Sequence, residues 1–177
     1  MKKLFTPVVF ICLVLSSATA QIAPNHASEI NRKNSWLKAG LNTGVPFADL
    51  ADVSRFVLGV ELKGQLMSTK NIGIGLSSGY NHFFPKEGFS NWGTIPAAAF
   101  IRYYPHRTGF FAGADLGYGF ITGTANNKGG LYARPQLGYH NRYWNFFGFY
   151  NGIFRSAGNC GHLQFAGVGA TYNLMFN

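Results

Sequence analysis

Carboxylates are scarce in this sequence, which has 6 Asp and Glu residues against 15 Lys and Arg residues in a chain of 177. The formal net charge is therefore +9 at neutral pH, which favours anionic neighbours through nonspecific electrostatics. Cysteine is scarcer still, with 2 residues, so a disulfide-dense scaffold is excluded. No helical periodicity of any length occurs, and no metal-ligand spacing or dinucleotide-binding fingerprint is present.

Long apolar runs are also missing, apart from one at the start of the chain. Two lysines precede an apolar stretch at 4–15, and small residues follow at 16–20. This order predicts a secretory signal peptide, residues 1–20, that is cleaved before Gln21. A membrane-anchoring helix is the alternative, but it needs about 20 apolar residues, and this run is shorter and contains Pro7.

Cleavage would leave 157 residues, which is 177 minus 20, and a net charge of +7, because two of the lysines are lost. Cys160 would then be the only cysteine, so no intramolecular disulfide and no cysteine-based metal site can form. An exported protein rarely meets nucleic acid, so we expect no nucleic-acid partner. Phosphorylated lipid head groups are the expected neighbours of the basic surface.

What the remaining chain does contain is glycine, 23 residues in all, and aromatic residues at 16%. Glycine is costly in helices and aromatic residues favour strands, so an all-β protein is predicted. Residues 55–66 and 71–84 alternate between apolar and small or polar side chains with a period of two. Eight strands are expected in total, at 35–45, 54–66, 71–84, 92–104, 109–122, 130–140, 143–155 and 162–176.

The connections between these strands alternate in length. Short turns are expected after strands two, four and six, at 67–70, 105–108 and 141–142. Longer loops are expected after strands one, three and five, at 46–53, 85–91 and 123–129, and a loop of intermediate length at 156–161. Short turns at one end and longer loops at the other are typical of an outer-membrane barrel with its short turns in the periplasm.

The polar face of the strands combines glycines with charged and amide side chains. Its larger members are Lys38, Asn42, Glu61, Lys63, Arg102, Asp115, Arg134 and Gln136. Small and charged residues together suit a narrow, hydrated barrel interior, so the apolar face must point outward, which is tolerable in lipid. All eight segments also reach the 9 to 11 residues, approximately, that a tilted transmembrane strand needs.

Aromatic residues on the apolar face are expected to form two girdles at the membrane interfaces. The expected periplasmic girdle is Tyr103, Phe110, Tyr139 and Phe176, and the expected external girdle is Tyr80, Phe84, Tyr118 and Phe120. For any one of these rings, ordinary core packing is the alternative. The segment at 143–155 has aromatic residues at both odd and even positions, so the sequence does not decide which of its side chains point into the barrel.

Three stretches carry a family resemblance: I-P-A-A-A-F-I-R-Y-Y-P at 95–105, G-F-F-A-G-A-D-L-G-Y-G at 109–119 and G-V-G-A-T-Y-N-L-M-F-N at 167–177. The chain resembles the small outer-membrane β-barrel proteins of Gram-negative bacteria, similar in plan to the OmpX and OmpA-type barrels. The resemblance implies an eight-stranded antiparallel up-and-down transmembrane β-barrel at 35–177, after a periplasmic segment at 21–34. It also implies that the barrel-assembly machinery reads the terminal strand, although Asn177 follows the terminal aromatic Phe176.

Six charged residues are expected to share one layer of the barrel interior near the periplasmic strand ends: Lys38, Glu61, Lys63, Arg102, Asp115 and Arg134. If Val45 lies opposite Ser54, then Lys38 faces Glu61 directly. A similar count places Arg134 diagonal to Asp115, with each acid bridged to more than one base. Separate hydration of each charge is the alternative.

An eight-stranded barrel is too narrow for an open pore, so we expect a non-porin scaffold or surface interaction protein that contacts outer-membrane lipid and lipopolysaccharide. No enzyme activity and no cofactor are expected, and a protein partner at the external loops is left unidentified. One alternative is a lipid-modifying enzyme that uses His82 or His162 with Ser78, Ser90 or Ser156 near Glu87. Another is a soluble periplasmic lipid-binding barrel.

Overall fold

The computed structural model describes residues 37–123, 129–155 and 162–174. Several sequence predictions lie outside the described residues. They are the signal peptide at 1–20, the periplasmic segment at 21–34, the loop at 156–161 with Ser156 and Cys160, and the girdle residue Phe176.

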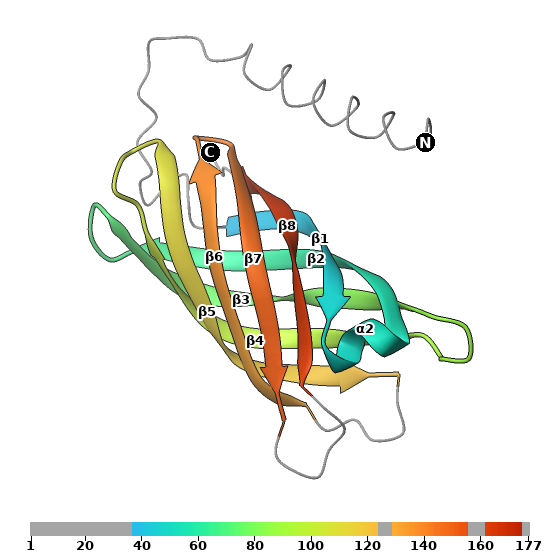
Figure 1. The fold of residues 1–177 in the computed structure, drawn as a ribbon. Helices are drawn as coiled ribbons and strands as arrows, with labels where there is room; N and C mark the ends of the chain where they lie inside the picture. Colours follow the sequence, from blue (N-terminus) through green and yellow to red (C-terminus); the bar gives the residue numbers. More distant parts are fainter. Residues whose placement is uncertain (1–36, 124–128, 156–161, 175–177) are drawn as a thin grey trace, which may run out of the picture.

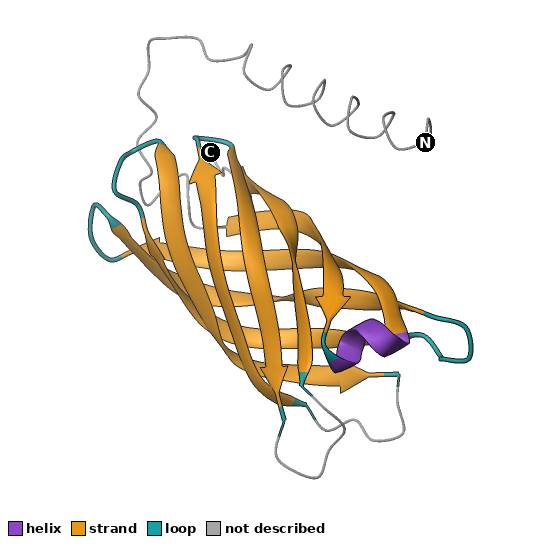
Figure 2. Cartoon of the chain, viewed as in Figure 1, coloured by secondary structure: helices purple, strands orange, loops and turns teal. Residues whose placement is uncertain are grey.

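The described chain is a closed barrel of eight antiparallel strands in up-and-down order, as the sequence predicted (Figures 1 and 2). The strands are β1 (Leu37–Phe47), β2 (Ser54–Met67), β3 (Ile72–Pro85), β4 (Trp92–Tyr103), β5 (Gly109–Thr122), β6 (Gly130–His140), β7 (Trp144–Phe154) and β8 (Leu163–Leu174). Pairing of β1 with β8 closes the sheet and removes both edges. Leu37 and Leu174 are paired, so both ends of the barrel chain lie at the end that carries the three short turns.

The first connection differs from its prediction. β1 continues through Phe47, and the expected loop at 46–53 contains a short helix, α2 (Asp49–Val53). Pro46 is paired with Phe165 of β8 but has no partner on β2, because the pairing of β1 with β2 ends at Gly44. The missing proline N–H therefore costs no bond to β2. Helix α2 covers the end of the barrel that carries the longer loops, and its Leu50 is buried (Figure 2).

Two further prolines lie inside strands, at positions where the pairing with one neighbour is interrupted. Pro96 of β4 lies in a gap in the β3–β4 pairing, between the pairs Ser78–Ala97 and Asn81–Thr94. Pro135 of β6 lies where β6 and β7 are unpaired between Ala133 and Gln136. Since proline has no N–H to donate, each ladder is broken on the side where that donor would be needed.

Side chains alternate between the barrel interior and the outside along every strand. The facing of β7, which the sequence left open, is settled by burial: Asn145, Phe147 and Phe149 point inward, whereas Trp144 and Phe146 point outward. Glycines on the inner face make room for rings that fill the interior. A Cβ at Gly169, for example, would lie 2.6 Å from a carbon of the Phe147 ring.

The interior is not polar throughout, which differs from the hydrated lumen that the sequence predicted. At the long-loop end, inward side chains form an apolar plug: Leu50, Val57, Phe83, Trp92, Ile121, Ile153, Leu163 and Phe165. The rings of Phe83 and Trp92 stack with centroids 4.0 Å apart, and Phe165 meets Phe83 edge-on at 5.6 Å. These bulky residues hold the inward positions of β3, β4 and β8 at this end, so the interior is apolar there.

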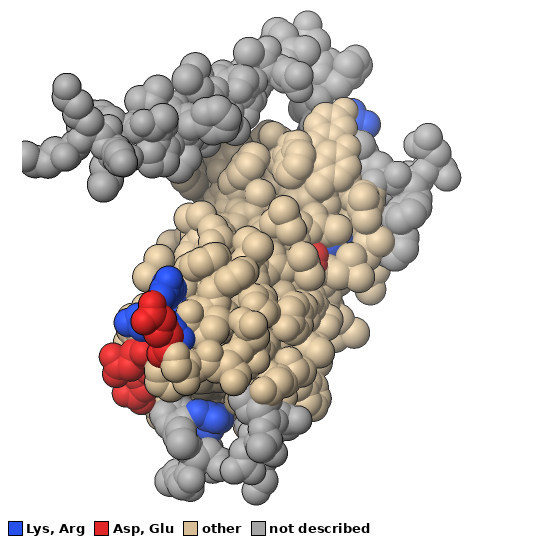
Figure 3. All heavy atoms as spheres, turned by 90° about the vertical axis from the view of Figure 1, so that its right-hand side faces the viewer, with Lys and Arg blue, Asp and Glu red and all other residues tan. Residues whose placement is uncertain are grey.

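The outside carries an apolar belt. Among the described residues, 25 large hydrophobic side chains are exposed, including Leu76 at 71% and Leu137 at 71%. On the face shown in Figure 3, acidic and basic side chains gather at one end and the broad middle is almost free of them. In the described residues, no helix is long and apolar enough to cross a membrane.

Candidate functional site

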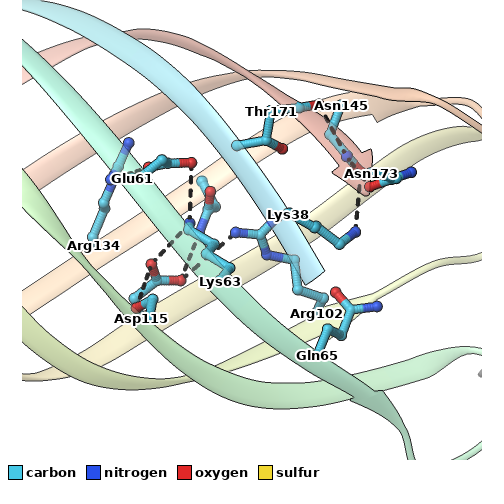
Figure 4. Close-up of polar contacts among 12 residues, drawn as sticks. Lys38, Glu61, Lys63, Gln65, Arg102, Asp115, Arg134, Asn145, Thr171 and Asn173 are labelled. Carbon is cyan, nitrogen blue, oxygen red and sulfur yellow. Dashed lines mark hydrogen bonds and ion pairs between the residues drawn. The ribbon is translucent and has the colours of Figure 1, made fainter. Parts of the chain in front are cut away.

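The barrel interior below the apolar plug holds a layer of six ionisable side chains, here called the charged layer. It comprises Lys38, Glu61, Lys63, Arg102, Asp115 and Arg134, each between 1% and 5% exposed. They come from β1, β2, β4, β5 and β6, because each occupies an inward position of its strand. The structure thus brings together all six residues that the sequence had placed in one layer (Figure 4).

Ion pairs connect five members of the charged layer. Glu61 accepts a hydrogen bond from Arg134 at 2.7 Å and lies 3.6 Å from the Lys63 ammonium. Asp115 accepts one from Lys63 at 3.1 Å and lies 3.8 Å from Arg102. Each carboxylate therefore has two basic partners, and Lys63 bridges the two carboxylates, which partly offsets the cost of burying all these charges.

Lys38 does not belong to this ion-pair network, and its expected pairing with Glu61 is wrong. The register places Lys38 opposite Lys63 and Glu61 opposite Gly40, two residues from the expected alignment, because β1 continues to Phe47 before the chain turns. The Lys38 ammonium instead donates to the Tyr104 hydroxyl and to the Asn145 side-chain oxygen, both at 3.3 Å.

Arg134 and Asp115 are direct opposites in the β5–β6 register, not diagonal neighbours as expected. Even so, the Arg134 guanidinium reaches across the barrel to Glu61 on β2. Asp115 is instead held by its same-face neighbour Gln136, whose amide donates to it at 2.7 Å. Partner choice in this layer is thus decided across the lumen as well as along the sheet.

Aromatic rings inside the barrel take up part of the positive charge. The centre of the Arg134 guanidinium lies 3.9 Å from the centroid of the Phe149 ring, and that of Arg102 lies 5.1 Å from the Phe111 ring. Lys63 lies 5.5 Å from the Phe147 ring. Such cation–π contacts are strongest where water is excluded, so they stabilise the buried cations here.

Tyr104 organises the short-turn end of the interior and is not among the predicted site residues. Its hydroxyl donates to Gln65 at 2.9 Å, and the Asn71 amide donates to its carbonyl oxygen at 2.6 Å. Burial raises the pKa of the Tyr104 phenol, which therefore keeps its proton at neutral pH. A period of two counted from Arg102 would have placed Tyr104 inward. Asn145, which donates to Asn173 of β8 at 2.8 Å, was hidden by the open facing of β7. Asn173 itself lies three residues before the expected outward position 176, so a period of two would have placed it inward.

Seven of the eight expected girdle residues lie within the described residues and face outward. Those at the short-turn end are Tyr103, Phe110 and Tyr139, and those at the long-loop end are Tyr80, Phe84, Tyr118 and Phe120. Phe84 is half-buried because its ring stacks on that of Phe56 at 4.1 Å. Tyr143, Trp144 and Phe146 add outward rings at the short-turn end, which the ambiguous β7 pattern concealed.

Within the described part of the chain, the candidate catalytic residues do not lie close together. His82 faces outward, where its Nδ1 lies 3.4 Å from the Tyr80 hydroxyl and its ring packs edge-on against Phe84. Ser78 lies four residues away on the same strand, at about 13 Å given the usual rise, which is beyond hydrogen-bond reach. Glu87 lies instead 3.8 Å from Arg55. His162 packs against the Phe154 ring.

Free space beside the charged layer is very small. A cavity of about 10 Å³ borders Glu61, Lys63, Asp115 and Arg134, which is close to the least volume that one water molecule needs. No group of three or more His, Cys, Asp or Glu residues in the described ranges is placed to hold a metal ion. The chemistry that this arrangement supports is therefore electrostatic cross-linking of the barrel wall.

Comparisons with known proteins show similarity in fold. No protein-family model matches the sequence, and no curated protein matches it. A solved structure from the de novo design of transmembrane β-barrels has a TM-score of 0.52 at 13% identity, and the match covers 82% of this chain and 99% of that one.

Two natural barrels of Pseudomonas aeruginosa align less closely. The N-terminal β-barrel domain of OprF has a TM-score of 0.47 at 14% identity, over 80% of this chain and 99% of that one. The outer membrane protein OprG has a TM-score of 0.44 at 13% identity, over 82% of this chain and 98% of that one.

Proposed function

We propose that this chain is an integral outer-membrane β-barrel protein that forms no pore and acts as a membrane scaffold or surface interaction protein. The observation that carries the proposal is the inverted distribution of polarity. Charged side chains such as Asp115 and Arg102 are 1% exposed inside the barrel, whereas leucines such as Leu76 are 71% exposed outside. A closed barrel with an apolar exterior satisfies its backbone internally, as a bilayer demands.

A soluble lipid-binding barrel fits these observations poorly. It would need a polar exterior and an open apolar cavity, whereas the apolar belt is exposed and the interior is filled by the apolar plug and the charged layer. A soluble monomer rarely exposes a contiguous apolar patch of more than a few hundred Å², and this belt runs around the whole barrel.

The two ends of the barrel support an orientation. Short turns at 68–71, 104–108 and 141–143 contrast with the longer connections at the α2 end. Outer-membrane barrels keep short turns in the periplasm, so α2 and the longer loops would face outward, where they can meet lipopolysaccharide or a protein partner. The terminal strand β8 would then be the segment that the barrel-assembly machinery reads.

Membrane fractionation tests the proposal. Expressed with residues 1–20 in place, the protein should be found with the outer membrane, should resist extraction by high salt or carbonate, and should change gel mobility on heating. The matched control is the Leu76→Asp, Leu137→Asp variant, which charges two outward positions and should fail to accumulate in the outer membrane. Recovery of the unmodified protein in the soluble periplasmic fraction would rule the proposal out.

A further inference from the structure

The described barrel interior holds more positive than negative charge. By formal charge, Lys38, Lys63, Arg102 and Arg134 are four cations and Glu61 and Asp115 are two anions, an excess of two. All six side chains are at most 5% exposed, so bulk water does not compensate the excess. A buried charge without a partner is far more costly than a paired one, and this excess therefore calls for a counter-charge.

Arg102 is the cation with the least compensation. It is 1% exposed, and none of its three guanidinium nitrogens has a hydrogen-bond partner in the described interior. Asp115 lies 3.8 Å away, too far for a hydrogen bond, and the nearby Tyr104 hydroxyl already accepts from Lys38 and donates to Gln65. A guanidinium carries five N–H donors and keeps its charge in proteins, so Arg102 cannot remove the cost by losing a proton.

Lys38 and His140 lie close to each other, because both contact the ring of Tyr104. The Lys38 ammonium, 1% exposed, contacts two neutral oxygens at 3.3 Å and forms no ion pair in the described interior. Its ammonium is 5.6 Å from the centroid of the Tyr104 ring, and the His140 ring meets that ring edge-on at 4.7 Å. Both His140 ring nitrogens are buried without a hydrogen-bond partner. Figure 4 shows Lys38 beside Arg102, on the side of Lys63 away from Glu61.

We propose that the short-turn half of the barrel interior binds one small inorganic anion of chloride size, held by Arg102 and Lys38 with His140 beside it. The anion accepts hydrogen bonds from the Arg102 N–H groups, which otherwise have no acceptor, and its single negative charge cancels half of the excess of two. A monatomic halide is the proposed occupant because side chains leave little free space beside the charged layer, so phosphate or a carboxylate ligand is too large for it. The site is independent of the scaffold role, since it depends only on the closed barrel.

Equilibrium unfolding in urea tests this proposal, with the mature chain refolded in detergent micelles. Sodium chloride is replaced stepwise by sodium gluconate at constant ionic strength, because gluconate is too large for the site. Above the dissociation constant, one bound ion raises the folded-to-unfolded ratio about tenfold for each tenfold increase in chloride. Bromide should act as chloride does. A ratio that does not depend on chloride would overturn the proposal.

Two matched variants assign the effect to the site. Lys38→Met removes one cation of the site and should flatten the chloride dependence, while stability in gluconate stays equal or rises because an uncompensated charge is gone. Lys70→Met makes the same charge change in an exposed turn and should keep the full dependence. Equal chloride dependence in the two variants would refute the assignment.

A direct observation covers the case in which Lys38→Met does not fold. Crystals of the unmodified protein grown in bromide should show an anomalous peak within hydrogen-bond distance of the Arg102 guanidinium. Absence of that peak, or peaks confined to the protein surface, would refute the site.

Discussion

The Glu61–Arg134 ion pair has the shortest separation among the ion pairs described in the charged layer, with a 2.7 Å hydrogen bond between two side chains that are 3% and 4% exposed. Replacing Glu61 with Met would leave the Arg134 guanidinium buried without its carboxylate. Breaking a buried pair in this way costs about 3 to 5 kcal/mol. Glu61→Gln should cost less, because the amide oxygen still accepts from Arg134, and a hydrogen bond to a charged group is worth about 1.5 to 3 kcal/mol.

A double-mutant cycle isolates the pair. Glu61→Met combined with Arg134→Met removes both charges and should cost less than the sum of the single changes, with a coupling of about 0.5 to 3 kcal/mol. Lys38→Met combined with Glu61→Met is the control, and it should be additive to within about 0.5 kcal/mol because the two side chains make no contact. Urea unfolding followed by tryptophan fluorescence measures each term. Additive effects for Glu61 and Arg134 would refute the account of the charged layer.

Three further predictions concern the exterior, the interior and residues 1–20. Arginine at any of the outward positions Leu58, Val60, Ile74 and Leu76 should destabilise the barrel in bilayers by about 2 to 4 kcal/mol near the midplane. Ser90→Arg, in the exposed loop at 86–91, should leave the stability nearly unchanged. Equal losses of stability in urea unfolding would contradict the assignment of these side chains to the outer face. Planar-bilayer recordings should show no stable large conductance, because the apolar plug closes the lumen, and reproducible porin-like steps would disprove that closure. N-terminal sequencing of the exported protein should begin at Gln21, and a chain that keeps residues 1–20 would contradict signal cleavage.

The strand count and strand order could be predicted because a period of two is visible in the sequence without any tertiary information, most clearly at 55–66 and 71–84. The direction of the side chains could not be predicted where the alternation of apolar and polar residues is ambiguous. Aromatic residues occupy both parities of β7, so the choice between Phe146 and Phe147 as the inward ring needed the packing of the whole barrel. Pro46 indicated the end of β1, yet a proline is acceptable where the pairing with β2 has ended, and the strand continues for one more residue.

The members of the charged layer could be predicted from parity alone, but their partners could not. The expectation for Lys38 depended on the register across the first loop, and a change of two residues moved Glu61 out of reach. The Glu61–Arg134 contact joins β2 to β6, which are not neighbours in the sheet. Long side chains in a narrow lumen select partners across the barrel, and sequence separation carries no information about that choice.

Spin labels along one strand test the central claim most directly, which is that the apolar belt lies in lipid. Leu58, Leu62 and Leu66 of β2 face outward and are 47%, 50% and 67% exposed. Each is replaced by a labelled cysteine in a Cys160→Ser background, and the protein is reconstituted in bilayers. We predict high collision rates with oxygen and low rates with a water-soluble nickel complex at all three positions, since oxygen concentrates in the hydrocarbon. High nickel accessibility at all three would contradict the membrane-spanning barrel.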